Sequence, residues 1–501
     1  MGQAMRILML GWEFPPYISG GLGTACYGLT RALAQRGHRV TFVLPKHVDG
    51  EIASHVNLLT PQDRPSQPAT GTRGRSAAPG ASQNDEGHRT PGEVASTFEY
   101  DPPVGSAALP GVTFKAVPSR IASPYGGGPV SGSHPYLSSL RSAPGRLSNG
   151  ATSAQGVAAD DQEGASRSGH PVAGEPSAPA YDPDHCAPIY TGDLPAEARR
   201  YADLCVDLAR GGDFDVIHAH DWLTFPAAQA VSAATGRPWV AHVHSTEHDR
   251  SGEQLNEAIA QIERAAVHRA GRVIAVSHLT RNILCERYGM APARCEVVYN
   301  GVEQTVRNGV ERQEPIEPPT GIGKDEKVVL FLGRVTMQKG PEYFVAAAKR
   351  VLEKMDNVKF VIAGAGDQID QTIRQASAAG IGKHVTFTGF LHGDEVAQAY
   401  ERADVFVMPS VSEPFGIAPL EAVAHDVPVI ISKQSGVSEV LTHALKVDFW
   451  DIDDIADKII GVLRHPSLGQ TMRKHADLQV RKLTWSGAAE RCGQVYNQAG
   501  A

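Results

Sequence analysis

Short runs of Val, Ile, Leu and Phe alternate with amphipathic helical stretches along most of this 501-residue chain. Such runs are typical of strands buried on both faces, and apolar residues at helical spacing between them are typical of helices that cover a sheet. Strands joined through crossover helices lie parallel in one sheet. The pattern therefore predicts an α/β fold with doubly wound parallel sheets.

The alternation occurs twice, which predicts two Rossmann-like domains that face each other across a cleft. In the first set we expect strands and helices at 6–11, 23–36, 39–44, 196–210, 215–218, 238–243, 253–269 and 272–276, with a helix beginning near Ser277. In the second set we expect them at 328–332, 341–355, 359–363, 385–388, 405–408, 415–424 and 427–431. The charged, Pro-containing stretch 303–327 has the composition of a linker.

A low-complexity stretch interrupts the first set at about 61–185, where Pro, Gly, Ser and Ala dominate. Such a composition buries too little apolar surface to offset its ordering entropy, so we expect a disordered insertion with its blocks at 61–97 and 138–183. The alternating residues 112–117 and the segment that carries Tyr125 and Tyr136 are expected to belong to the fold.

These features divide the chain into a first domain at 1–305, a second domain at 326–485 and a C-terminal helix at 486–501. The 47 basic and 55 acidic residues give a net charge of −8, which argues against a nucleic-acid partner. The six cysteines show no C-x-x-C pattern, and no apolar run is long enough for a transmembrane segment. We expect a cytoplasmic protein.

Loops that follow strands carry the chemistry in such folds, because ligands bind beyond the carboxyl ends of the strands. In the first loop, Gly20, Gly21 and Gly23 let backbone approach a ligand, and the helix that begins there offers free N–H groups to an anion. A dinucleotide fingerprint fails, because Cys26 stands where its third glycine belongs. A purely structural turn is the alternative.

Two histidine pairs, His218/His220 and His242/His244, stand at strand ends. Their i, i+2 spacing places each pair on one face of the sheet, which allows a zinc site, structural histidines, or polar groups that line a cleft. We favour the last, because Asp221 directly follows His220 and the metallohydrolase pattern fails.

The second domain carries an anion clamp and two acids. Arg334 follows the first strand of this domain and Lys339 precedes a helix, an arrangement suited to a diphosphate, although surface ion pairs are an alternative. Glu413 and Glu421 stand eight apart around Phe415 and Gly416, with Glu413 at a helix entrance and Glu421 within the helix. Glu413 taken alone is equally typical of a helix-capping acid.

Together these motifs resemble the retaining GT-B glycosyltransferases of family 4 and the glycogen/starch synthase group. The resemblance covers both domains but not the insertion. It implies that 1–305 is the acceptor-side domain, that 326–485 binds the nucleotide-sugar, and that the helix at 486–501 packs back on the first domain. It rests on these segments: Gly20-Gly21-Leu22-Gly23, His218-Ala219-His220-Asp221-Trp222, Gly333-Arg334 with Lys339, Gly364-Ala365-Gly366-Asp367, and Glu413-Pro414-Phe415-Gly416 with Glu421. His244-Ser245-Thr246-Glu247 is similar to the cleft-histidine region of glycogen synthases, and Tyr299-Asn300-Gly301-Val302 to the motif that ends the first domain.

The resemblance implies a hexosyltransferase that uses ADP- or UDP-glucose. Arg334 and Lys339 would hold the diphosphate, Glu421 the ribose, and Glu413 the sugar, with His244 and Asp221 on the facing side. Gly20 and Gly21 would offer N–H groups to phosphate, and Phe415 and Gly416 would complete the donor loop.

No cofactor or metal is expected, because side chains and helix ends supply the positive charge. The Asp-x-Asp triplets at Asp182, Asp213 and Asp451 lie in the insertion, before a strand and at a helix start, so none is expected to clamp a metal.

Ile18 stands where bacterial glycogen synthases carry a lysine, which separates this chain from strict equivalence with those enzymes. The segments 12–16 and 246–250 look like a glycogen-synthase-like branch of family 4, and we expect α-glucan synthesis. The alternatives are transfer to a lipid, cell-surface glycan or small acceptor, a GT-B sugar-nucleotide epimerase, and a non-catalytic sugar-nucleotide binder.

Overall fold

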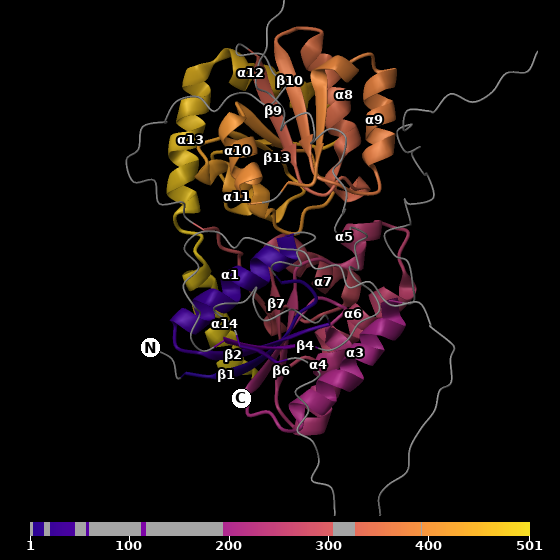
Figure 1. Cartoon of the computed structure of the whole chain (residues 1–501), viewed down its shortest axis with the longest axis vertical. Helices are drawn as coiled ribbons and strands as arrows, with labels where there is room; N and C mark the ends of the chain where they lie inside the picture. Colours follow the sequence, from indigo (N-terminus) through magenta and orange to yellow (C-terminus); the bar gives the residue numbers. More distant parts are fainter. Residues whose placement is uncertain are drawn as a thin grey trace, which may run out of the picture.

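The computed structural model describes residues 4–14, 21–45, 57–59, 112–116, 194–303, 326–391 and 393–500. Two α/β domains stack along the long axis of the molecule (Figure 1), and this confirms the predicted fold class. The expected low-complexity blocks, Gly20 and most of the 303–327 stretch lie outside the described residues.

The first domain is built on an eight-stranded parallel sheet with the order β3-β4-β2-β1-β5-β6-β7-β8. Its elements are β1 (Arg6–Leu10), α1 (Gly21–Gln35), β2 (Arg39–Leu44), β3 (Asn57–Leu59), β4 (Val112–Ala116), α3 (Leu194–Ala209), β5 (Val216–His220), α4 (Phe225–Thr235), β6 (Trp239–Val243), α5 (Glu247–Ser251), α6 (Glu257–Arg269), β7 (Arg272–Ala275), α7 (His278–Tyr288) and β8 (Cys295–Val297).

The second domain has a six-stranded parallel sheet with the order β11-β10-β9-β12-β13-β14. Its elements are β9 (Lys327–Leu332), the 3₁₀ turn η4 (Met337–Lys339), α8 (Pro341–Leu352), β10 (Val358–Ala363), α9 (Ile369–Ala378), β11 (Val385–Gly389), α10 (Asp394–Arg402), β12 (Val405–Met408), α11 (Ile417–Ala424), β13 (Val429–Ser432), the 3₁₀ turn η6 (Gly436–Glu439), β14 (Leu445–Val447), α12 (Ile452–Arg464) and α13 (Pro466–Val480).

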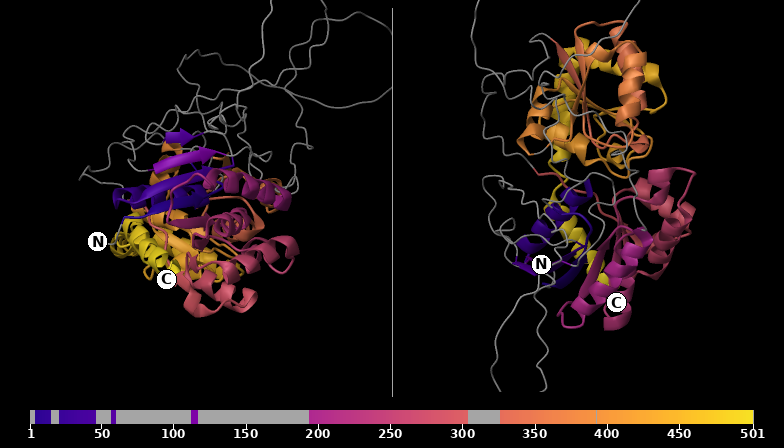
Figure 2. Two further views of the ribbon diagram at one scale, coloured as in Figure 1. Left: turned by 90° about the horizontal axis from the view of Figure 1, so that it is seen from below. Right: turned by 45° about the vertical axis from the view of Figure 1, so that its right-hand side comes forward.

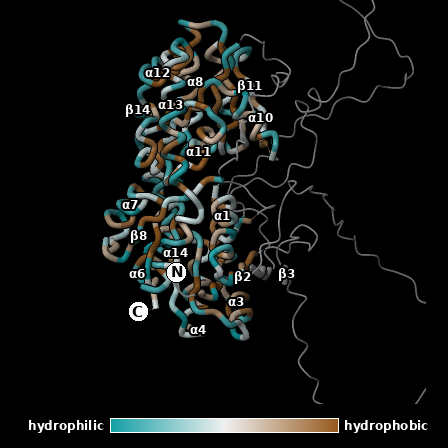
Figure 3. The backbone as a smooth tube through the Cα atoms, turned by 90° about the vertical axis from the view of Figure 1, so that its left-hand side faces the viewer, coloured by the Kyte–Doolittle hydropathy of each residue, from teal (hydrophilic) through white to brown (hydrophobic). Residues whose placement is uncertain are grey.

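Each sheet has an apolar core on both faces, as expected for parallel strands that helices cover on two sides. Alternate residues of a strand enter different cores: in β1, Leu8 and Leu10 face one core while Ile7 and Met9 face the other. Apolar segments accordingly run through the interior of both domains (Figure 3). Among the described residues, no helix is long and apolar enough to cross a bilayer.

Helix α14 (Trp485–Ala499) follows the second domain in sequence but packs on the first, against α1, β6 and β7. Figure 2 shows the yellow end of the chain passing down from one domain into the other. The buried Cys492, Val495 and Tyr496 enter the same core as Leu29 and Leu33 of α1. Gly301 lies against the start of α14 and leaves no room for a side chain, since a Cβ there would lie 2.3 Å from the backbone nitrogen of Trp485.

Candidate active site

Loops at the carboxyl ends of the two sheets meet between the domains. Ser412, in the loop after β12, donates a hydrogen bond to Asp249 of α5, and Ser277, after β7, donates one to the Pro414 carbonyl. Most of the predicted site residues lie on these loops or on the helices that follow them. Topology alone therefore brings residues that are far apart in the sequence to one interface.

Lys339 and Glu413 form an ion pair beside these interdomain contacts. The Lys339 Nζ lies 2.5 Å from Glu413 Oε2, and Glu413 is only 6% exposed. The turn that carries Lys339 ends at Gly340, whose φ of +67° and close approach to the Pro409 carbonyl exclude a side chain. A largely buried ion pair of this kind fixes both partners relative to each other.

The backbone around Glu413 is tied to the strand-like segment before η6. Glu413 N donates to Gln434 O, and Gly436 N donates to Glu413 O. Contrary to expectation, Glu413 is not at the helix entrance: α11 begins four residues later, at Ile417, because Gly416 takes a φ of +106° that ends the preceding loop. Phe415 is buried and its ring stacks on Tyr299 of the first domain, with 5.8 Å between ring centroids.

The glycine motif after β10 packs backbone to backbone against the loop that carries Arg334. A Cβ on Gly364 would lie 1.8 Å from the Gly333 carbonyl oxygen, and one on Gly366 would lie 2.2 Å from the Val335 oxygen. Arg334 itself is partly buried. These two glycines hold the Arg334 loop in place, which is a packing role that their spacing did not reveal.

Glu421 lies on α11, where its carboxylate accepts a hydrogen bond from the Tyr400 hydroxyl at 3.0 Å. Burial raises the pKa of Glu421. The residue lines a cavity of about 310 Å³ between the domains, together with Thr24 of α1 and Trp485 of α14. Glu421 is therefore within the helix, as predicted, and faces a hollow large enough for part of a small ligand.

Gly21 begins α1 and so places the free N–H groups of that helix at the interface. A Cβ at Gly21 would lie 3.9 Å from Ile417, the first residue of α11. The glycine-rich helix start and the donor-loop helix are thus neighbours, which the sequence positions, almost 400 apart, could not show.

The histidines form a buried ladder. The prediction that the two pairs line a cleft is therefore wrong for His218, His220 and His242. His218, His220 and His242 are each at most 2% exposed. His218 Nε2 lies 3.0 Å from His242 Nδ1, and His220 Nδ1 lies 2.9 Å from His244 Nε2. The neighbouring strands β5 and β6 set His220 directly beside His242, which brings the pairs together.

A metal ion could use ring nitrogens of His218, His220 and His242, which lie within 4.8 Å of one another. Four ring nitrogens are taken up by the two bonds within the ladder, and His218 Nδ1 bonds to the Tyr496 hydroxyl at 2.8 Å. Burial lowers the pKa of both His218 and His244 to about 3, so these rings are neutral at neutral pH. Two further ring nitrogens, His220 Nε2 and His242 Nε2, are buried and have no hydrogen-bond partner among the described residues, so the metal-free interpretation stays a prediction.

Asp221 is buried and positions His244. Its Oδ1 accepts a hydrogen bond from His244 N at 2.7 Å and a longer one from Ser245 N. Asp221 has a φ of +59°, a strained conformation for a residue with a side chain, and burial raises its pKa to about 7. This side chain acts on the loop after β6, where His244, unlike the other three histidines, is partly exposed.

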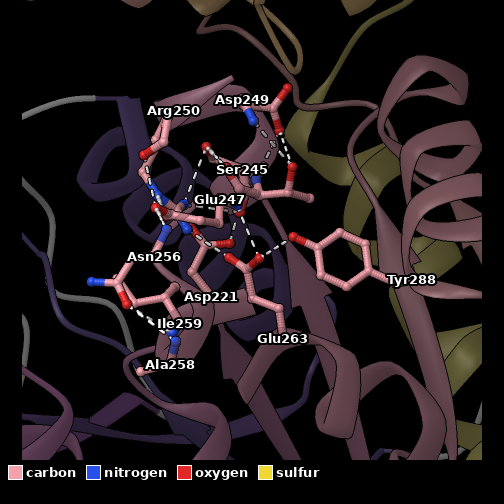
Figure 4. Close-up of polar contacts among 12 residues, drawn as sticks. Asp221, Ser245, Glu247, Asp249, Arg250, Asn256, Ala258, Ile259, Glu263 and Tyr288 are labelled. Atoms are coloured by element: carbon pink, nitrogen blue, oxygen red, sulfur yellow. Dashed lines mark hydrogen bonds and ion pairs between the residues drawn. The ribbon is translucent and has the colours of Figure 1, made fainter. Parts of the chain in front are cut away.

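A charged cluster in the first domain also stabilises the loop after β6 (Figure 4). Arg250 pairs with Glu263 at 2.6 Å and with Glu247 at 3.2 Å, and it donates to the Ser245 carbonyl. Tyr288 donates to Glu263. Sequence reasoning missed this cluster, although Thr246-x-x-Asp249 has the spacing of a capping box, which the structure forms.

Two of the Asp-x-Asp triplets fall within the described residues. Asp213 and Asp215 both pair with Arg6 beside the start of β1, and Asp451 caps the start of α12. Each of these three carboxylates thus has a structural partner away from the domain interface.

Different family models match the two domains of the chain. The family model for group 1 glycosyl transferases matches residues 312–479, that for glycosyltransferase family 4 matches 164–305, and that for the starch synthase catalytic domain matches 6–72. An uncharacterized glycosyltransferase of Methanocaldococcus jannaschii is 34% identical over 297 residues, which cover 57% of this chain and 76% of the relative. The glycogen synthase of Mycobacterium tuberculosis is 28% identical over 290 residues, with 56% and 68% covered.

Solved structures show the same fold. Sucrose-phosphate synthase from Thermosynechococcus elongatus superposes with a TM-score of 0.62 at 18% identity and covers 99% of this chain and 98% of its own. Anabaena HepE in complex with UDP and glucose gives a TM-score of 0.60 at 15% identity, with 98% and 99% covered.

Proposed function

The chain belongs to the group 1 glycosyltransferases, and on this premise we propose that it moves glucose from a nucleoside diphosphate glucose to an α-glucan, with retention at the anomeric carbon. The observation that carries the proposal is the Lys339–Glu413 ion pair at the domain interface, with Glu421 on the helix that follows. It joins a cation suited to phosphate with an acid suited to sugar hydroxyls. The starch synthase match at 6–72 and the glycogen synthase relative favour the glucan acceptor.

In the proposed mechanism the second domain holds the donor. Arg334 and Lys339 neutralise the charge that grows on the departing diphosphate, which lowers the barrier because these cations are fixed in advance. The N–H groups at the start of α1, at Gly21, contribute from the opposite side. Gly20, which the sequence predicts to share this role, lies outside the described residues. Glu421 binds the ribose within the cavity that it lines.

The sugar end lies between Glu413 and His244. Glu413 accepts hydrogen bonds from sugar hydroxyls, and Phe415 and Gly416 shape the loop that presents it. Asp221 fixes the backbone of His244, so that its neutral ring can bond to the transferred sugar. Attack from the face of the leaving phosphate would account for retention without a carboxylate nucleophile.

A second candidate is transfer to a small phosphorylated acceptor. The D-inositol 3-phosphate glycosyltransferase 1 of Catenulispora acidiphila is 29% identical over 306 residues. The shared second domain supports the same donor chemistry, and the acceptor then depends on the first domain. Product analysis separates the two candidates.

The test is a screen of ADP- and UDP-sugars with glycogen, with inositol phosphate and without acceptor, with the released nucleotide as readout. The expected result is glucose transfer to glycogen, an α-linkage by NMR, and an unchanged rate in EDTA. Transfer to another acceptor would overturn the glucan assignment, and isomerised donor without transfer would indicate an epimerase. A loss of rate in EDTA that zinc or manganese restores would overturn the metal-free mechanism.

A further inference from the structure

The short helix α5 of the first domain contacts the second domain at the turn that carries Lys339. Its residue Asp249 is buried, with 3% exposure, and each carboxylate oxygen has a partner. Oδ2 accepts hydrogen bonds from the Thr246 backbone and hydroxyl at 2.8 and 2.7 Å, while Oδ1 accepts one from the Ser412 hydroxyl at 2.6 Å. One oxygen thus caps α5, and the other reaches across to the opposite domain.

Asp249 is held rigidly from its own side. Arg250, the next residue, is anchored in the first domain by Glu263 and Glu247 (Figure 4). The guanidinium forms ion pairs where both partners are almost fully buried, so moving it would expose or separate charges in the interior. The position of the Asp249 carboxylate is therefore a property of the first domain, not of the loop that it meets.

Ser412 lies directly beside the donor machinery. It precedes Glu413, and Val411 N donates to the carbonyl of Gln338, the residue before Lys339. A change in the position of Ser412 is therefore transmitted to both Lys339 and Glu413. On the other side of Glu413, the Pro414 carbonyl accepts a hydrogen bond from Ser277 of the first domain at 2.6 Å.

We propose that Asp249 is a positioning residue that acts through Ser412, and that the donor loop takes its productive geometry only while the two domains are in contact. The inference rests on the proposed donor role of Lys339 and Glu413. The first domain would then do more than bind the acceptor, because it would also set the sugar end of the donor site. Loss of the contact is expected to lower turnover, while the nucleotide contacts of the second domain remain.

The test is a double-mutant cycle on the full-length enzyme with Ser412→Ala, Asp249→Ala and the double variant. Loss of a hydrogen bond to a charged group predicts a fall in kcat for Ser412→Ala of roughly tenfold. The affinity for nucleoside diphosphate, measured by calorimetry, should stay close to wild type, and Ser412→Thr, which keeps the hydroxyl, should restore kcat. Adding Ser412→Ala to Asp249→Ala should lower kcat no further.

Ser232→Ala is the matched control, because it removes a 2.7 Å hydroxyl bond to the Arg237 carbonyl within the first domain and away from the interface. Asp249→Ala also breaks the cap of α5, so its melting temperature is read separately. Wild-type kcat in Ser412→Ala, or equal losses from Ser412→Ala in both backgrounds, would overturn the positioning role. If the wild type uses another donor or acceptor, the proposed function is wrong. The double-mutant cycle can then be measured with that substrate pair, so the positioning role is tested separately.

Discussion

At the scale of single residues, Lys339 and Glu413 meet across 74 positions of sequence. Each was predicted to contact the donor, and neither motif indicated that they pair with each other. The pair has an energetic consequence, because removal of the lysine leaves a largely buried carboxylate without its cation. The two ends of the donor site are coupled through this contact.

We predict that Arg334→Ala and Lys339→Ala each lower kcat/KM for the donor by roughly 30-fold to several thousand-fold, since a developing charge left unpaired costs about 2–5 kcal/mol. Glu421→Ala should mainly raise the donor KM, because the ribose does not change during transfer. Steady-state kinetics on these variants is the measurement. Lys354→Ala, which breaks an exposed ion pair with Asp457, is the control. Wild-type kcat/KM in the Arg334 and Lys339 variants would refute the clamp.

The buried histidine ladder predicts that the protein loses stability in acid. Burial lowers the pKa of His218 to about 3, whereas an unfolded histidine has a pKa of about 6.5. As the pH falls from 6.5 towards 3, the unfolded chain takes up a proton here that the folded chain does not. The unfolding free energy should therefore fall by about 1.4 kcal/mol per pH unit for this group.

Urea unfolding of wild type and His218→Gln between pH 7.5 and 5 tests this prediction. The variant should be less stable at pH 7.5, because it loses the bonds to His242 and Tyr496, yet its stability should depend less on pH. The exposed His465 gives the control His465→Gln, which should follow wild type. Equal pH slopes for wild type and His218→Gln would contradict the assignment.

At the scale of elements, periodicity predicts the strands well. The ranges 39–44 and 405–408 coincide with β2 and β12, because a buried parallel strand must be apolar throughout. The short helix α5 was missed, since its five largely charged residues have no apolar periodicity. Arg250 of α5 pairs with Glu263 of α6, and the His248 ring contacts Tyr288 of α7. The same holds for the histidines: i, i+2 spacing predicts a shared face, but only the sheet order makes β5 and β6 neighbours.

The turn between η4 and α8 gives a prediction about backbone crowding. Gly340 and Gly380 both have a positive φ, +67° and +75°, but a Cβ on Gly340 would lie 2.2 Å from the Pro409 oxygen, whereas Gly380 faces open space. Gly380→Ala should cost about 1–2 kcal/mol from backbone strain alone. Gly340→Ala should cost more and should also lower donor turnover, because Lys339 would shift. Equal melting temperatures for the two variants would contradict this prediction, because they would show that the turn at Gly340 accommodates a side chain without added cost.

At the scale of the whole molecule, the low-complexity composition of the insertion gives a further prediction. Deleting residues 61–97 and 138–183 while keeping 112–136 should leave a folded, active enzyme, because loop length costs only logarithmically in closure entropy. Thermal melting and donor turnover of the shortened chain are the measurements. A shortened protein that folds but has lost donor turnover would assign the blocks to substrate binding.

The placement of α14 has a consequence for biosynthesis. Its residues are translated after the whole second domain, yet they complete the core of the first and supply the Tyr496 partner of His218. At about 5–20 residues per second, a ribosome needs on the order of ten seconds or more to pass from β8 to α14. Throughout that interval the nascent first domain exposes the apolar face that α14 later covers, so the two domains mature together instead of one after the other.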